Sequence, residues 1–186
     1  MLSEIVCFLL NTVFTLFGVA LLLRVWMQAV CMPPYNPVKQ AVLQVTNWIV
    51  LPLRRIITGT RGIDWASVVA ALLAAFVYVV LMMSLAGMDV LSILPTIVIV
   101  ALTIAKWALN LVLWMTILMA LLSWLNPRSP AMAILFPLTA PLFNPLRRVL
   151  PNIGGLDLSP ILLCVIVQVL LMVVTRVVIS MTLLTM

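Results

Sequence analysis

Two copies of a basic tetrapeptide are the first feature of this chain that could do chemistry. Pro-Leu-Arg-Arg occurs at residues 52–55 and again at 145–148, in a sequence with only 8% charged residues. A basic side chain held at a membrane surface contributes about 1 kcal/mol of attraction to anionic lipid, and it also acts as a topology signal. We therefore predict four residues that bind anionic phospholipid or a cytoplasmic protein partner: Arg54, Arg55, Arg147 and Arg148.

Both tetrapeptides lie in a longer internal repeat. With one constant offset, residues 45–64 match residues 138–157 at seven positions without a gap. The matches include the Arg-Arg pair and a Gly-hydrophobic-Asp sequence that ends each copy. Attraction to lipid alone does not require an identical Pro-Leu-Arg-Arg spacing, so the repetition favours docking of a protein partner slightly. Two plain topology signals are the simpler alternative.

A second set of polar residues lies inside otherwise apolar stretches. Lys106 and Asn110 are four residues apart and fall on one helix face, and Gln168 and Arg176 are two turns apart. A charge in hydrocarbon costs at least a few kcal/mol, so it is expected to face the bundle interior or a watery cavity. One alternative is that these four residues form an ion-conducting or coupling site. The other is structural, with two acidic and two basic residues that neutralise each other: Glu4, Asp89, Lys106 and Arg176.

The sequence contains no motif that is typical of catalysis or of cofactor binding. The chain has no histidine, and its three cysteines are far apart without a C-x-x-C pair. It also lacks a glycine-rich phosphate loop and paired aspartates within the apolar stretches. We therefore predict no catalytic residue, no metal site and no cofactor. In so hydrophobic a chain, we expect the net charge of +6 to set the orientation in the membrane and to attract anionic lipid. We expect no nucleic-acid partner.

Four apolar stretches must position these residues. Two thirds of the chain is hydrophobic, and about 20 apolar residues in a helix cross the hydrocarbon core. The candidates are residues 3–25, 65–87, a stretch within 96–125, and 160–182. The predicted fold class is an all-α integral membrane protein with four transmembrane helices.

The segments between the paired spans carry the basic residues and are themselves patterned. In the first, apolar residues recur at helical spacing from Val38 to Ile56, which predicts an amphipathic helix at the membrane interface. The second contains Pro137, Pro141 and Pro145, so we predict two short turns rather than one helix. Three residues are predicted to cap the spans that follow: Asp64, and Asp157 or Ser159.

The loop charges predict the orientation. Both basic loops should be cytoplasmic by the positive-inside rule, which places both termini outside. The expected organisation is two parallel repeats, residues 1–88 and 97–186, joined by an outer connector at 89–96.

Several motifs carry a resemblance to a known family. They are "LLLRVWMQ" (21–28), "NP" (36–37), "SW" (123–124), "SP" (129–130) and "PLRRVLPNIGGLDLSP" (145–160). On these the chain resembles the YggT family of small bacterial inner-membrane proteins, whose relatives include YlmG proteins and plastid cofactor-assembly factors. The first copy departs from the pattern, with Thr58 where the second has Pro151, and Arg61 where it has Gly154.

The resemblance implies a multi-pass inner-membrane protein, with links to osmotic-stress tolerance, ion uptake, cell division and haem attachment. Without histidine, this chain cannot copy imidazole ligation of a cofactor. The favoured function is a non-enzymatic scaffold, assembly or accessory protein that presents two basic platforms to the cytoplasm. The alternative is an ion transporter or transport accessory, with potassium as the first candidate ion. Association with further copies of the same chain is left as an open alternative.

Overall fold

The computed structural model describes residues 2–57, 64–87, 93–125, 129–149 and 159–183. All regular structure in these ranges is α-helical. The helices are, in chain order, α1 (Leu2–Ala29), α2 (Pro37–Ile56), α3 (Trp65–Leu85), α4 (Ile93–Leu125), α5 (Pro130–Val149) and α6 (Ser159–Leu183).

Four of these helices are long and apolar enough to span a membrane, namely α1, α3, α4 and α6. The predicted fold class is thereby confirmed. Helix α4 begins at Ile93, inside the predicted connector at 89–96. Its 33 residues extend about 50 Å, which exceeds the roughly 30 Å hydrocarbon core. This helix must therefore tilt or project beyond the core.

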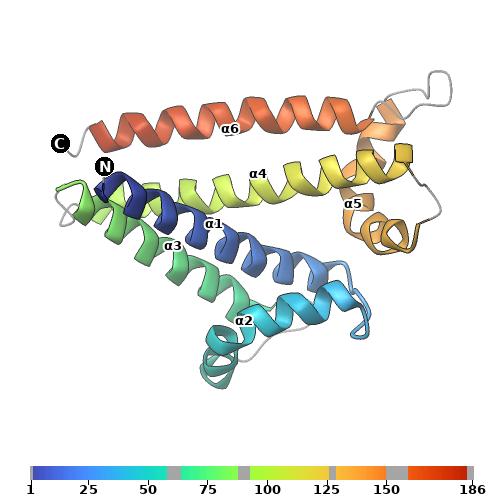
Figure 1. The fold of residues 1–186 in the computed structure, drawn as a ribbon, viewed down its shortest axis with the longest axis horizontal. Helices are drawn as coiled ribbons and strands as arrows, with labels where there is room; N and C mark the ends of the chain where they lie inside the picture. The colour runs from blue at the N-terminus through green and yellow to red at the C-terminus, as the bar shows by residue number, and fades with distance from the viewer. Residues whose placement is uncertain (1, 58–63, 88–92, 126–128, 150–158, 184–186) are drawn as a thin grey trace.

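The spans form two pairs. Figure 1 shows α1 beside α3 and α6 beside α4, with α4 also lying against the first pair. Helices α2 and α5 lie where α1 and α4 end, and we call this the α2/α5 end. Both ends of the chain lie at the opposite end of the bundle (Figure 1).

Helices α2 and α5 are local equivalents. Each has 20 residues and begins with proline, and their bounds differ by one constant offset. The side chain of Asn36 caps α2 by accepting a 2.9 Å hydrogen bond from the backbone N–H of Val38. Ser129 occupies the corresponding place before α5, and its hydroxyl accepts from the N–H of Met132 at 3.3 Å. A side-chain acceptor followed by proline starts a helix efficiently.

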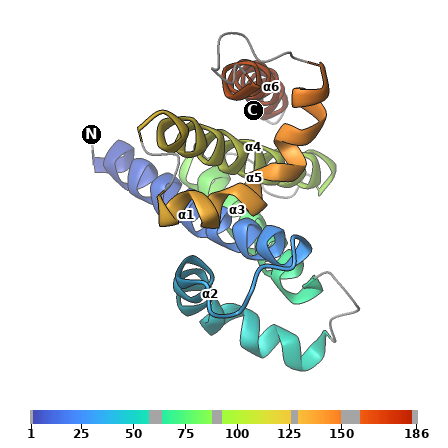
Figure 2. The same cartoon turned by 90° about the vertical axis from the view of Figure 1, so that its right-hand side faces the viewer.

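The prediction that α5 would be two short turns is wrong. The helix continues through Pro137, Pro141 and Pro145 and bends on its way across the bundle (Figure 2). Tertiary packing holds it, because Leu138 and Phe143 are fully buried against the spans. The indole N–H of Trp26, near the end of α1, also donates to the Leu138 carbonyl oxygen at 2.9 Å.

Small residues allow the spans to pack closely. Helix α3 buries a series of alanines: Ala66, Ala70, Ala71, Ala74 and Ala75. On α1, a Cβ atom at Gly18 would lie 2.1 Å from a ring carbon of Trp107 on α4, so only glycine fits there. Close contact matters because lipid offers no hydrophobic driving force for helix association.

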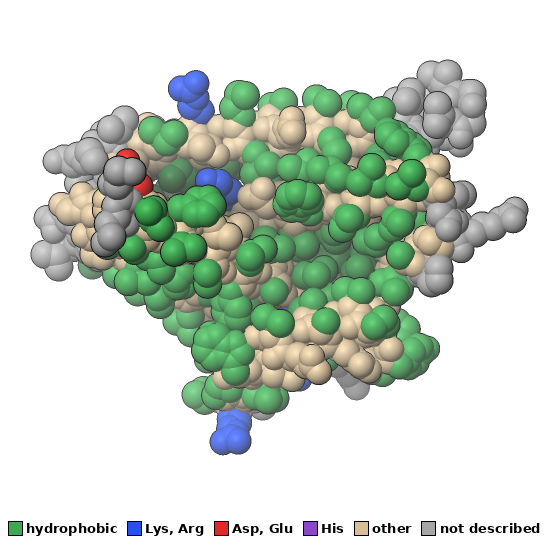
Figure 3. All heavy atoms as spheres, in the orientation of Figure 1, with side chains coloured by type: hydrophobic (Ala, Val, Ile, Leu, Met, Phe, Trp, Pro, Cys, Tyr) green, Lys and Arg blue, Asp and Glu red, His purple; other side chains and the backbone are tan. Residues whose placement is uncertain are grey.

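The outer surface of the bundle is apolar. Figure 3 shows hydrophobic side chains over most of the visible face. Helix α6 packs mainly on α4 and α5, and large apolar residues such as Val169, Met172 and Ile179 are exposed along it. Such a surface suits contact with lipid acyl chains.

Candidate functional site: a buried arginine–aspartate cluster and a polar cavity

Asp64 is the centre of a buried ionic cluster at the α2/α5 end. Its Oδ2 atom accepts hydrogen bonds from Arg24 Nε at 3.3 Å and from Arg54 Nη2 at 2.5 Å. Its Oδ1 atom accepts a further hydrogen bond from Arg54 Nε at 3.3 Å. The hydroxyl of Ser67 donates to the same carboxylate at 2.7 Å. Arg24 and Asp64 are only 4% and 2% exposed, whereas Arg54 is 45% exposed. The cluster therefore ties α1, α2 and the start of α3 together.

Two polar residues of α2 complete the surroundings of Arg24. Its Nη1 donates to Thr46 Oγ1 at 2.8 Å and to Asn47 Oδ1 at 3.0 Å. The Thr46 hydroxyl donates in turn to the Val42 carbonyl oxygen at 2.7 Å. A buried charge needs hydrogen-bond partners of this kind, because they offset the cost of its desolvation.

Asp64 occupies the predicted N-cap position of α3, although its side chain serves the ionic cluster and not the helix backbone. The side chain makes no cap hydrogen bond, because the two arginines and Ser67 occupy its oxygens. Burial alone would raise the pKa of Asp64. Hydrogen bonds from Arg54 and Ser67 and the charges of Arg54 and Arg24 outweigh burial, so the pKa lies below its ordinary value.

Sequence reasoning missed the role of Arg24. Its partners are 22 to 40 residues away along the chain, so no local spacing indicates them. One signal was available: Arg24 is the sole charged residue in the second half of α1, and a charge in an apolar span needs a partner.

The structure divides the four predicted lipid- or partner-binding arginines. Arg54 turns toward Asp64, while Arg55 is exposed. On α5, the guanidinium carbon of Arg147 lies 5.6 Å from the centre of the Phe143 ring, a cation–π arrangement. The side chain of Arg148 lies outside the described part of the structure.

The other two predicted caps are only partly described. Ser159 is the first residue of α6 and is buried. Asp157 lies outside the described residues, as does Asp89 of the predicted charge cluster.

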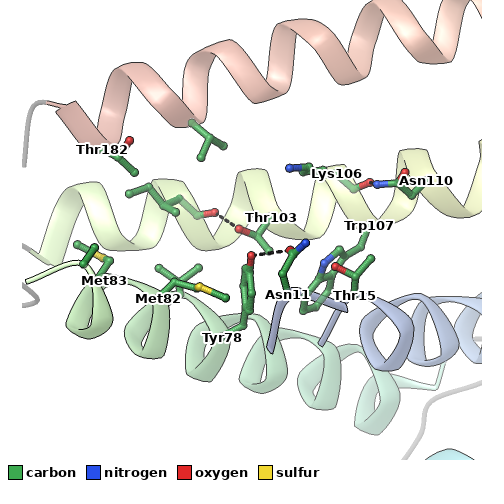
Figure 4. A pocket seen from close by; sticks show the side chains of 14 residues that line it. Asn11, Thr15, Tyr78, Met82, Met83, Thr103, Lys106, Trp107, Asn110 and Thr182 are labelled. Carbon is green, nitrogen blue, oxygen red and sulfur yellow. Dashed lines mark hydrogen bonds between the residues drawn. The ribbon is translucent and has the colours of Figure 1, made fainter. Parts of the chain in front are cut away.

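A polar cavity of about 250 Å³ opens between the four spans, toward the end of the bundle that holds both termini. Figure 4 shows Asn11 and Thr15 of α1, Tyr78 of α3, and Lys106 and Asn110 of α4 around it. The Tyr78 hydroxyl donates to Asn11 Oδ1 at 2.9 Å. Lys106 thus lines a polar cavity, in line with the rule for charges within membranes.

The remaining polar residues of the predicted intramembrane set lie elsewhere. Gln168 and Arg176 are exposed on α6, outside the cavity lining. Glu4 is exposed in the first turn of α1. Lys106 and Asn110 are brought together, with Asn110 Nδ2 donating to the Lys106 carbonyl oxygen at 2.9 Å.

Comparison with known proteins completes the description of the class. The sequence model of the CCB3/YggT family matches residues 3–85 and 91–178. The "Uncharacterized protein YggT" of Escherichia coli strain K12 is 39% identical over 172 residues, covering 91% of this chain and 89% of the relative. The "Uncharacterized protein in proC 3'region" of Vibrio alginolyticus is 36% identical over 163 residues, covering 87% and 88%. No solved structure matches.

Fold and composition define a multi-pass α-helical membrane protein. The family match extends over nearly the whole chain. The chain therefore belongs to the CCB3/YggT family, which confirms the resemblance inferred from its motifs.

Proposed function

We propose that this protein is a non-enzymatic scaffold or assembly factor of the bacterial inner membrane, with a role in osmotic stress. Helices α2 and α5 form its two basic platforms, and both face the cytoplasm. The platforms hold anionic phospholipid and present a docking surface to a protein partner.

The exposed face of α2 is the observation that carries this proposal. Trp48 is 68% exposed although its ring centre lies 5.5 Å from that of Phe17 on α1, and Ile56 is 83% exposed. Arg55 is exposed within one turn of Ile56. An apolar face flanked by cations inserts into the headgroup boundary of an anionic membrane. Because α5 starts and ends at the equivalent positions, the second platform repeats the first.

Neighbouring arginines of α2 provide the test. In reconstituted membranes, Arg55→Gln should lower the preference of the protein for spin-labelled phosphatidylglycerol over phosphatidylcholine, with the melting temperature unchanged. Arg54→Gln should lower the melting temperature instead, because Arg54 contacts Asp64. An unchanged lipid preference in Arg55→Gln combined with Arg147→Gln and Arg148→Gln would contradict the platform.

Ion transport is the second candidate, and the polar cavity between the four spans favours it. The cavity holds hydroxyl and amide oxygens that could replace part of an ion's hydration shell. Lys106 counts against a cation as cargo, because it repels positive charge. Liposomes containing the purified protein would show potassium flux that Lys106→Met alters if this candidate holds, and would stay tight to potassium and sodium if it does not.

A further inference from the structure

A second cavity, of about 220 Å³, lies at the α2/α5 end between α1 and α2. Three cationic side chains line it, Arg24, Lys39 and Arg54, together with the amide of Gln28 and three apolar residues: Met27, Val42 and Leu43. We propose that this cavity binds a phosphoryl group, either as inorganic phosphate or as the phosphate of a lipid headgroup.

Positive charge is in excess around the cavity, which favours binding of an anion. Asp64 contacts Arg24 and Arg54 from outside the cavity lining, so one carboxylate is present for the three cations that line the cavity. The other acidic residue in the described part of the chain, Glu4, lies in the first turn of α1, at the opposite end of the bundle. Cations crowded into a partly desolvated site repel each other strongly. A bound anion would offset this repulsion, with one negative charge from a phosphodiester headgroup or up to two from inorganic phosphate.

Hydrogen-bond donors remain available in the right places. Among the described residues, Asp64, Thr46 and Asn47 accept from Arg24 through Nε and Nη1, and its Nη2 is left over. Arg54 uses Nε and Nη2 on Asp64, which leaves its Nη1. Lys39 Nζ donates to the Met32 carbonyl oxygen at 2.5 Å and keeps two further protons. Phosphate oxygens accept strongly from such charged donors.

Size and depth fit the same ligand. A cavity of about 220 Å³ has room for a tetrahedral anion and several waters, since a water occupies about 30 Å³ in the liquid. Arg24 lies five residues, or about 7.5 Å, before the end of α1 at Ala29. The cavity is therefore near the end of this span, where the hydrocarbon core gives way to the headgroup region.

The cavity is distinct from the two proposed platforms. The platforms use exposed cations such as Arg55, whereas the cavity uses Arg24 and Lys39, which point between α1 and α2. It also holds for either orientation of the protein in the membrane.

Lys39→Gln is the informative variant, because glutamine can still donate to the Met32 carbonyl oxygen while the charge is lost. Arg176→Gln is the matched control, since it removes one exposed cation on α6 outside the cavity. Purified protein in neutral detergent is titrated with radiolabelled inorganic phosphate and, separately, with phosphatidylglycerol against phosphatidylcholine. Gln28→Leu, which changes no charge, is a second cavity variant.

We expect saturable binding that Lys39→Gln weakens about tenfold to a hundredfold, the usual value of one charged hydrogen bond, and that Arg176→Gln leaves intact. Binding of inorganic phosphate would identify a free anion as the ligand, and binding of phosphatidylglycerol alone would identify a headgroup. Equal loss in Lys39→Gln and Arg176→Gln would reduce the effect to net charge and overturn the proposal. Absence of saturable binding by either probe would overturn it as well. The platform is tested separately by Arg55→Gln.

Discussion

At the scale of single residues, one carboxylate organises the α2/α5 end. Asp64 pairs with two arginines from two other helices, and the buried Arg24 would be costly in its place without this carboxylate. The pairing also explains why the adjacent Arg54 and Arg55 differ. Arg54 joins helices, and Arg55 remains available to ligands outside the protein.

Replacing Asp64 should destabilise the bundle. Asp64→Asn leaves Arg24 buried without a counter-charge, which typically costs about 3–5 kcal/mol, and less here where Arg54 can turn to solvent. A second change, Arg24→Met, should recover part of the loss, because coupled residues deviate from additivity. Thermal unfolding in detergent measures both. Simple addition of the two losses would show that the pair is not coupled.

The same carboxylate predicts a dependence on pH. The pKa of Asp64 is lower in the folded protein than its ordinary value, which is about 3.9. Its contribution to stability is therefore complete above about pH 4 to 5 and is lost as the pH falls through the folded pKa. The difference in melting temperature between the native protein and Asp64→Asn should shrink below about pH 4. A difference that stays constant down to pH 2 would contradict the pairing.

At the scale of helices, the sequence pattern predicted those elements whose formation depends on a single property. The number of consecutive apolar residues determines a span, so all four spans were predictable. Helix α5 was not, because proline content predicts a break while burial of Leu138 and Phe143 holds the helix together. The N-cap position of Asp64 was predictable, but its pairing with Arg24 was not, because the two residues are distant in sequence.

Contact between α1 and α4 should depend on Gly18. A methyl group there would overlap the Trp107 ring, so Gly18→Ala should cost about 1–3 kcal/mol, the usual penalty for overpacking. Trp107→Leu in the same chain should restore part of the stability by clearing the space. Unfolding in detergent provides the comparison, and a Gly18→Ala variant as stable as the native protein would contradict this packing.

At the scale of the whole molecule, the proposed function depends on which side of the membrane holds α2 and α5. Both helices lie at one end of the bundle (Figure 1), and their basic residues predict that this end is cytoplasmic. A cytoplasmic scaffold requires this orientation, because an external α2/α5 end would face away from any cytoplasmic partner.

Accessibility of Cys31 tests this orientation most directly. Cys31 is exposed between α1 and α2, and serine replaces Cys7 and Cys164 to leave one thiol. A membrane-impermeant maleimide added to intact cells should leave Cys31 unlabelled until the membrane is opened. In a chain that also carries Cys31→Ser, a cysteine replacing Ala86, exposed at the other end of the bundle, should react at once. Labelling of Cys31 from outside, with Ala86→Cys protected, would contradict the cytoplasmic platform.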